Sequence, residues 1–224
     1  MKPAFAVLAV ACYGSVLFAQ QGVNMFKEPH HALLTYIRNM RVFDVNVAPK
    51  EMTLDHIHDH DTVTIVLGPA MTRTQITGQD WTAPRDRALG AVEINMYTGA
   101  AITHKLENVG STPYRIYTVE NMRDSGWSTP QTIQAPGTTV LMESRSFTVY
   151  DVKLSAGTPT TMHVHENPTF LVVMSGAIEV QAGGGEAPFK LQQPGRWFPS
   201  SGPDQPQTLT VIGGDAHVID VETR

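Results

Sequence analysis

The amino-acid sequence predicts an all-β protein built from two similar barrels or sandwiches in tandem. Short segments rich in β-branched and aromatic residues follow one another, and turns containing Gly and Pro separate them. One segment, DHIHDHD at 55–61, carries three histidines at alternate positions. The same pattern recurs 107 residues later, and such self-similarity is the sign of an internal repeat.

Besides the histidine segments, five strands are expected in each half of the chain. They fall at 41–47, 62–67, 91–97, 104–108 and 114–120 in the first half, and near 147–154, 169–174, 177–182, 207–212 and 216–222 in the second. Three glycines at 183–185 predict a hairpin loop. An apolar spacing typical of a helix occurs only at 32–37, where a short helical turn is expected.

The two halves align without a gap around the histidines. HIH at 56–58 matches HVH at 163–165, and the residues on either side match in the same register. The sequence therefore predicts a tandem duplication, with units at 33–122 and 140–224 and a linker at 123–139.

Charge and cysteine content exclude several function classes. The chain has 224 residues, 42% of them hydrophobic, which is enough apolar material for a globular core. Its formal net charge is −5 and it contains no basic run, so nucleic acid and anionic membrane surfaces are not expected partners. Cys12 is the only cysteine, so the fold is expected to need no disulfide and to use no thiolate chemistry.

The first 19 residues have the pattern of a secretory signal peptide, with a lysine near the start and then an uncharged apolar run. We therefore expect export to the periplasm or the cell exterior, cleavage, and no membrane attachment of the mature chain. The alternatives are an uncleaved anchor, for which the run is short, and a lipoprotein site at Cys12, which would leave apolar residues after the cysteine. Residues 20–33 are expected to form a tether, with no role for His30 or His31.

The alternating histidines can share one face of a strand. Successive side chains of a strand point to opposite sides, so His56 and His58 lie on the same side with Cα atoms about 6.6 Å apart. That spacing lets two imidazoles bind one metal ion at about 2.0–2.1 Å each. A histidine-rich turn exposed to solvent is the alternative, and the second copy of the motif favours the metal site.

These residues resemble the cupin superfamily, and the duplicated arrangement resembles a bicupin. Cupins carry a first motif with two histidines one residue apart followed by a glutamate, and a second motif on a later strand that ends in a histidine and an asparagine. HIH at 56–58 is similar to the histidine pair, and HKLEN at 104–108 is similar to the end of the second motif. The resemblance implies two jelly-roll β-barrels and a metal site formed by His56, His58 and His104.

The glutamate of the cupin motif is missing from both units. Its position falls at Thr62 or Val63 in the first unit and at Thr169 or Phe170 in the second. The first unit therefore matches the three-histidine variant of some cupin dioxygenases, with His60 as an additional candidate ligand.

The second unit also lacks the third histidine. A glutamine, either Gln205 or Gln207, stands where the motif has histidine. This leaves His163 and His165 as a weak second metal site, and we expect the unit to be degenerate.

The resemblance implies a secreted, metal-dependent enzyme acting on a small organic substrate, with an oxygen-using oxidoreductase of the dioxygenase type as the favoured reaction. The alternative is a non-catalytic bicupin that binds a metal or small ligand, or is structural. Imidazole ligands suit a divalent transition metal but do not distinguish Fe, Mn, Ni, Cu and Zn. The family also suggests a homodimer. No catalytic residue is assigned, because Asp61, Glu93 and Glu107 are near the site only in sequence and are expected to be solvated surface carboxylates.

Overall fold

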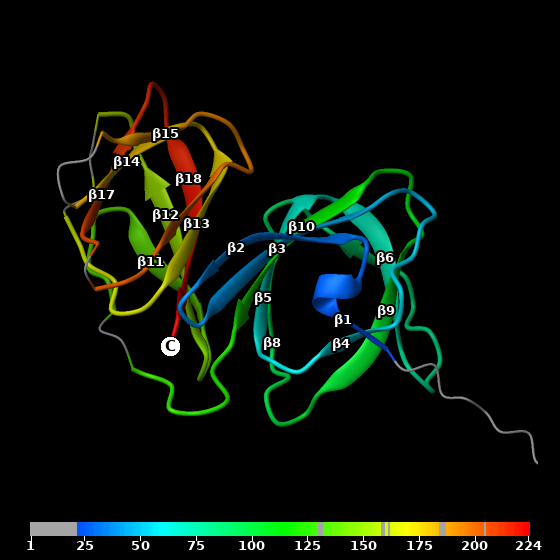
Figure 1. The fold of residues 1–224 in the computed structure, drawn as a ribbon. Coiled ribbons are helices and arrows are strands. Elements are labelled where there is room, and N and C mark those ends of the chain that lie inside the picture. The colour runs from blue at the N-terminus through cyan, green and yellow to red at the C-terminus, as the bar shows by residue number, and fades with distance from the viewer. Residues whose placement is uncertain (1–21, 130–131, 158–159, 161, 184–186, 204) are drawn as a thin grey trace, which may run out of the picture.

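The computed structural model describes residues 22–129, 132–157, 160, 162–183, 187–203 and 205–224, and these are almost entirely strands, turns and loops (Figure 1). The all-β prediction is therefore confirmed. The predicted signal peptide at 1–19 and positions 184 and 185 of the glycine loop lie outside the described residues. Within the described ranges, no helix has the length and apolar character needed to span a membrane.

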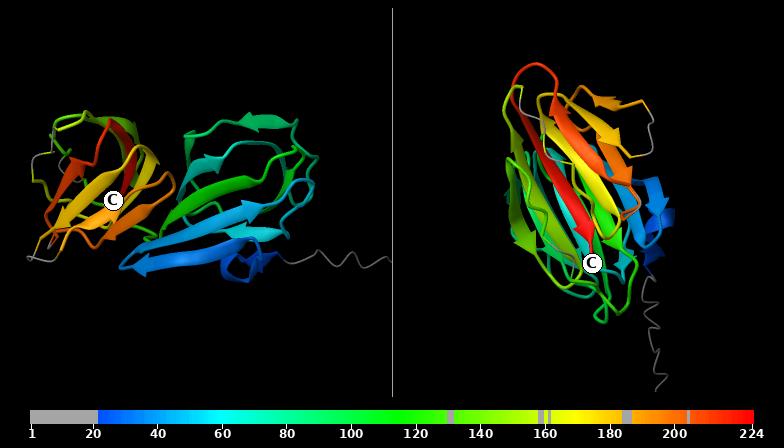
Figure 2. Two further views of the ribbon diagram at one scale, coloured as in Figure 1. Left: turned by 90° about the horizontal axis from the view of Figure 1, so that it is seen from above. Right: turned by 90° about the vertical axis from the view of Figure 1, so that its left-hand side faces the viewer.

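The first half of the chain forms two facing sheets of five strands (Figure 1). One has the order β1-β4-β9-β6-β7, with β1 Val23–Asn24, β4 His56–His58, β9 Ile102–Asn108, β6 Ala70–Ile76 and β7 Arg85–Arg87. The other has the order β2-β3-β10-β5-β8, with β2 His31–Ile37, β3 Met40–Val47, β10 Tyr114–Asn121, β5 Thr62–Gly68 and β8 Val92–Asn95. The short 3-10 helix η1 (Met25–Lys27) lies across one end of this pair (Figures 1 and 2).

The second half of the chain forms two more sheets beside the first pair (Figure 2). One has the order β11-β12-β18-β13-β16, with β11 Thr138–Glu143, β12 Phe147–Leu154, β18 Ala216–Thr223, β13 Thr169–Ser175 and β16 Trp197–Ser200. The other has the order β15-β14-β17, with β15 Phe189–Leu191, β14 Ile178–Ala182 and β17 Gln207–Val211.

The predicted barrels are pairs of open sheets. In the described part of the chain, no strand ladder joins the edge of one sheet to the edge of the sheet it faces. This is the double-sheet form of a jelly roll, which is closed by side chains packed between the sheets and not by backbone hydrogen bonds.

The side chains of strand β10 point alternately to the two faces of its sheet, and each face belongs to a different core. Ile116 and Thr118 face the space between the two amino-terminal sheets, whereas Tyr117 and Val119 point the opposite way. There they join a core that includes Phe170 of β13, whose ring centroid is 5.4 Å from that of Tyr117. The sheet containing β10 therefore packs back to back against the sheet containing β13.

Two expectations for the amino-terminal region are wrong. Residues 32–37 belong to strand β2, because pairing with β3 along the whole segment outweighs the local apolar spacing. Residues 22–33 are not a tether, since Met25 is buried in the core and Glu28 is 1% exposed. At the other boundary, β11 begins at Thr138, inside the predicted linker.

Candidate metal centre

The register of β4 and β9 brings three histidines together. His56 and His58 lie two residues apart on β4, so both side chains point to the same side of the sheet. On the neighbouring strand, His104 stands directly opposite His56 in an antiparallel pair. The two sequence motifs therefore meet through backbone pairing, although 48 residues separate them.

The three rings converge on one point. Their centroids are 5.0 Å apart for His56 and His58, 4.6 Å for His56 and His104, and 4.8 Å for His58 and His104. The ring nitrogens that face each other all lie within 4.8 Å of one another. The Nε2 atoms of His56 and His104 are 3.1 Å apart, close to the roughly 3 Å expected of two nitrogens bound at right angles to one ion at about 2.1 Å.

All three rings are held in the neutral form that binds metals. Burial lowers the pKa of His56 to about 4 and that of His104 to about 3, and it holds the pKa of His58 well below its usual value, with the neighbouring histidines adding to each shift. The Nδ1 of His56 donates to the carbonyl of Leu54 at 2.8 Å, which leaves the Nε2 lone pair facing the cluster. The Nδ1 of His58 is buried without a hydrogen-bond partner among the described residues. This donor set fits a divalent transition metal.

The buried carboxylate of Glu28 holds the backbone just before β4, the strand that carries His56 and His58. Glu28 accepts a hydrogen bond from the backbone N–H of Leu54 at 3.1 Å, the residue whose carbonyl holds His56. Its other oxygen lies 2.5 Å from Nδ1 of His31, and the His31 ring centroid is 4.8 Å from that of His56. Burial opposes the charged form of Glu28, but hydrogen bonds from His31 and His30 outweigh it and lower the pKa of Glu28 to about 2.

Sequence reasoning missed this support. The segment EPHH at 28–31 was assigned to a tether because it lies before the repeat and has no counterpart in the cupin motifs. Three titratable residues within four positions, Glu28, His30 and His31, were the available signal.

The replacement Glu28→Gln should weaken metal binding at the three-histidine centre by about 10–100-fold, the usual effect of removing a charged partner behind metal-binding histidines. Glu51→Gln is the matched control, because the Glu51 side chain is 58% exposed and its one ion pair among the described residues is with His30, at 3.5 Å. Competition with a chromophoric chelator measures both affinities. Equal affinities in the two variants would show that Glu28 does not support the centre.

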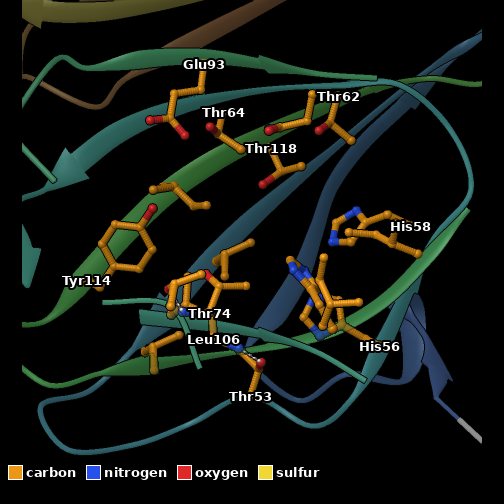
Figure 3. A pocket seen from close by; sticks show the side chains of 18 of the residues that line it. Thr53, His56, His58, Thr62, Thr64, Thr74, Glu93, Leu106, Tyr114 and Thr118 are labelled. Carbon is orange, nitrogen blue, oxygen red and sulfur yellow. Dashed lines mark hydrogen bonds between the residues drawn. The ribbon is translucent and has the colours of Figure 1, made fainter. Parts of the chain in front are cut away.

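The three histidines open into a cavity of about 320 Å³ between the two amino-terminal sheets (Figure 3). Its wall carries many hydroxyl groups, among them Thr62, Thr64, Thr118, Tyr97 and Tyr114. Thr62 occupies the position of the missing cupin glutamate, because its side chain faces the cavity while Val63 is buried in the core on the other side of the sheet. The wall next to the histidines therefore offers hydroxyl groups where the motif has a carboxylate.

The three carboxylates near the motif have different surroundings. Glu93 lines the cavity, where it is bonded to Arg87 at 2.6 Å and paired with Arg85. Glu107 pairs with Arg73 at 2.6 Å. Asp61 was expected to be solvated, which is wrong: it is fully buried and serves as a hydrogen-bond acceptor for surrounding groups.

His60 lies outside the three-histidine cluster. Its Nδ1 faces Asp59 at 2.8 Å, and the ring belongs to a separate group with Asp59 and Glu120. The chain bends away from β4 after His58, so the strand alternation that made His60 a candidate ligand does not continue to it.

The second half of the chain has a different arrangement at the matching positions. Gln207 stands opposite His163, as His104 stands opposite His56, so Gln207 and not Gln205 takes the place of the third histidine. The rings of His163 and His165 are 5.3 Å apart. The second half of the chain therefore presents two histidines and an amide at the positions where the first half presents three histidines.

His165 is enclosed by two acidic side chains. Its Nε2 is 3.0 Å from Asp220 and its Nδ1 is 3.1 Å from Glu222, and all three groups are buried. Asp220 faces Tyr150 on β12 as Thr118 faces Phe43 on β3, so this carboxylate stands where the first half has a threonine. Burial disfavours the charged ring, but the two carboxylates outweigh it and raise the pKa of His165 to about 10.

No protein-family model and no curated protein matches this sequence. Several solved structures are similar to the structure of this chain. AerE from Microcystis aeruginosa is 14% identical with a TM-score of 0.64, covering 88% of this chain and 93% of that one. A cupin 2 conserved barrel domain protein from Leptotrichia buccalis is 9% identical with a TM-score of 0.59, covering 87% and 88%. Salicylate 1,2-dioxygenase from Pseudaminobacter salicylatoxidans is 13% identical with a TM-score of 0.65, covering 86% and 75%. This likeness, together with the sheet topology, shows that the chain has an all-β cupin fold.

Proposed function

We propose that the protein is a metal-dependent bicupin enzyme that uses oxygen to oxidise a small organic molecule, in the manner of a dioxygenase. The observation that carries this proposal is the meeting of three neutral imidazoles at the wall of a cavity large enough for a small substrate. His56, His58 and His104 would hold the ion, and a bound divalent metal supplies Lewis acidity and positions for substrate and oxygen.

The residues around the cavity favour a substrate that carries negative charge or an acidic hydroxyl group. The ligand set contains no carboxylate, so a bound divalent ion keeps its full positive charge. Burial raises the pKa of Tyr97 and of Tyr114, although Arg87 opposes both shifts, so both phenols remain hydrogen-bond donors at neutral pH. The Tyr97 ring lies 5.0 Å from that of His58, and can orient a substrate beside the metal. Among the similar structures, the salicylate 1,2-dioxygenase has been solved in complex with gentisate, which supports a substrate of this size.

The two halves have the same order of strands but different side chains at the matching positions, and this supports the bicupin assignment. The sheet orders β2-β3-β10-β5-β8 and β11-β12-β18-β13-β16 follow the same pattern, which supports two similar units near 33–122 and 140–224, the first extended to His31 and the second to Thr138. The second unit has Gln207 in place of a histidine and encloses His165 between carboxylates. We therefore assign the chemistry to the first unit and a supporting role to the second.

Export and self-association are part of the proposal. The apolar run at 1–19 supports a secreted or periplasmic protein without a membrane anchor after cleavage. The mass of the mature chain recovered from the periplasm would test this, and a chain that begins at Met1 would contradict it. The homodimer suggested by the family is tested by light scattering on the same sample.

One observation favours the alternative of a non-catalytic bicupin that binds a metal or small ligand. Both oxygens of Glu93 are paired with arginines, Oε1 with Arg85 and Oε2 with Arg87, so this carboxylate at the cavity wall is already engaged in ion pairs. A protein of this kind would bind the metal without consuming oxygen.

Metal content and oxygen uptake separate these functions. We expect the wild-type protein to contain a transition metal. His104→Ala removes a ligand, so its affinity for the metal should fall by more than the roughly 10–100-fold caused by changes outside the ligand set. Oxygen uptake is followed with diketones, flavonoids, thiols and aromatic hydroxy acids as substrates, and with His217→Ala as control, because that ring pairs with Asp151 far from the centre. A wild-type protein that takes up none of Fe, Mn, Ni, Cu and Zn would overturn the proposal. Metal binding without oxygen uptake would favour the non-catalytic alternative.

A further inference from the structure

A second group of metal-binding side chains lies where the chain leaves β4 and passes the end of β10. It consists of Asp59, His60 and Glu120, whose ligand atoms all lie within 4.8 Å of one another. Nδ1 of His60 is 2.8 Å from Asp59 and 3.9 Å from Oε1 of Glu120, and Nε2 is 3.5 Å from Asp124. None of these four residues lines the cavity beside the three histidines. The group is therefore separate from the first centre.

Glu120 has one oxygen that nothing in the described chain satisfies. The side chain is 1% exposed, and its Oε2 accepts hydrogen bonds from Arg41 at 2.6 and 2.7 Å. Oε1 is buried and has no hydrogen-bond partner among the described residues. At 3.9 Å, the nearest nitrogen of His60 is too far away for a hydrogen bond. A buried acceptor without a partner is costly, so the position of Oε1 indicates a missing positive group.

The separation and the charge suit a divalent cation. Two ligand atoms at about 2.1 Å from one ion lie between about 3 Å and about 4 Å apart, depending on the angle between them, and the 3.9 Å from Nδ1 of His60 to Oε1 of Glu120 falls within that range. Asp59 and Glu120 bring two carboxylates to the group, and Arg41 pairs with one oxygen of Glu120. The free oxygen of Glu120 and the carboxylate of Asp59 are therefore placed to bind a cation together with the imidazole of His60.

We propose that Asp59, His60 and Glu120 form a second site for a divalent cation. One imidazole and several carboxylates suit Zn²⁺ or Mn²⁺. The site directly follows the strand that carries His56 and His58, so an ion there would fix the end of that strand. The proposal does not depend on the first centre being catalytic.

Titration with Zn²⁺ tests the second site by calorimetry in a His104→Ala background, in which the first centre is disabled. We expect His104→Ala to bind one Zn²⁺ per chain, and the double variant His104→Ala/His60→Ala to bind none. His104→Ala/His217→Ala is the matched control and should still bind one, because His217 is also a partly exposed histidine beside an aspartate.

Asp59→Asn is a second variant that should fold whatever the effect of His60→Ala, because the Asp59 side chain is 51% exposed. Combined with His104→Ala, it should weaken Zn²⁺ binding at least tenfold while the circular dichroism spectrum stays unchanged. The proposal is overturned if His104→Ala binds no Zn²⁺, or if the His60 or Asp59 change leaves the affinity as it was. Failure of metal binding in the wild-type first centre would instead count against the proposed enzyme.

Discussion

Replacing His165 with alanine should lower the free energy of unfolding by about 3–5 kcal/mol at neutral pH, the usual cost of removing one partner from a buried ion pair. Both ring nitrogens face carboxylates at 3.0 and 3.1 Å, and the His165 side chain is 2% exposed. Without the ring, Asp220 and Glu222 remain buried with no positive charge between them. Urea denaturation of the two proteins measures the difference.

The control for His165 is His217→Ala. His217 pairs with Asp151 at 2.5 Å, but its side chain is 33% exposed, so water screens the pair and a loss below about 1 kcal/mol is expected. If both replacements cost the same, the buried network adds nothing beyond an ordinary surface pair.

The same network predicts how stability changes with pH. The pKa of His165 is raised to about 10 in the folded protein, above the value of 6.5 expected for an unfolded chain. Its contribution is therefore fully present below pH 6.5 and is lost as the pH rises towards 10. Wild-type stability should fall across this window more steeply than that of His165→Ala. Parallel curves for the two proteins would contradict a charged, buried His165.

Replacing Asp61 with alanine should also cost about 3–5 kcal/mol, because several donors would lose their acceptor inside the protein. Its Oδ1 accepts the backbone N–H groups of Tyr97 at 2.6 Å and Thr98 at 2.8 Å. Its Oδ2 accepts the Ser146 hydroxyl and the guanidinium of Arg145 at 3.2 Å. The carboxylate thus joins a loop of the first half to the start of β12, and urea denaturation again measures the loss.

Arg145→Ala is the control for Asp61→Ala, because it removes one of the groups bonded to the Asp61 carboxylate and leaves the carboxylate in place. The Arg145 side chain is 42% exposed, so its removal should cost much less than removal of the buried carboxylate. Burial opposes the ionised form of Asp61, but hydrogen bonds from Ser146, Thr98, Arg145 and Tyr97 outweigh it and lower its pKa. Its contribution is therefore present above pH 3.8, the value for an unfolded chain, and is lost as the pH falls further. Equal losses in the two variants would show that the backbone donors at Tyr97 and Thr98 find other partners.

The fold and the meeting of the three histidines could be predicted because both depend on local pattern. Alternation places His56 and His58 on one face whatever lies around them. The match of HKLEN at 104–108 to a motif on a later strand then supplied the third ring, and β9 does pair with β4 at His104. The strand pattern likewise needs only spacing and turn residues.

The surroundings of the site could not be predicted, because they depend on contacts between segments far apart in sequence. Glu28 acts on His56 through the backbone of Leu54, 26 residues away. The cluster of titratable residues at 28–31 does not indicate which strand it contacts. The distinction between Gln205 and Gln207 required the strand register. The positive charge of His165 depends on carboxylates 55 and 57 residues later in the chain, which no local pattern connects to it.

The sheets of β10 and β13 share one core, so each half of the chain covers apolar side chains of the other half and keeps them from water. Val119 and Val221 are fully buried in this core, and each such side chain contributes about 1.5–3 kcal/mol by leaving water. A fragment cut between the halves would keep its histidines yet expose a broad apolar surface to water. The second half therefore supports the candidate metal centre indirectly, because it covers the outer face of β10 with apolar side chains.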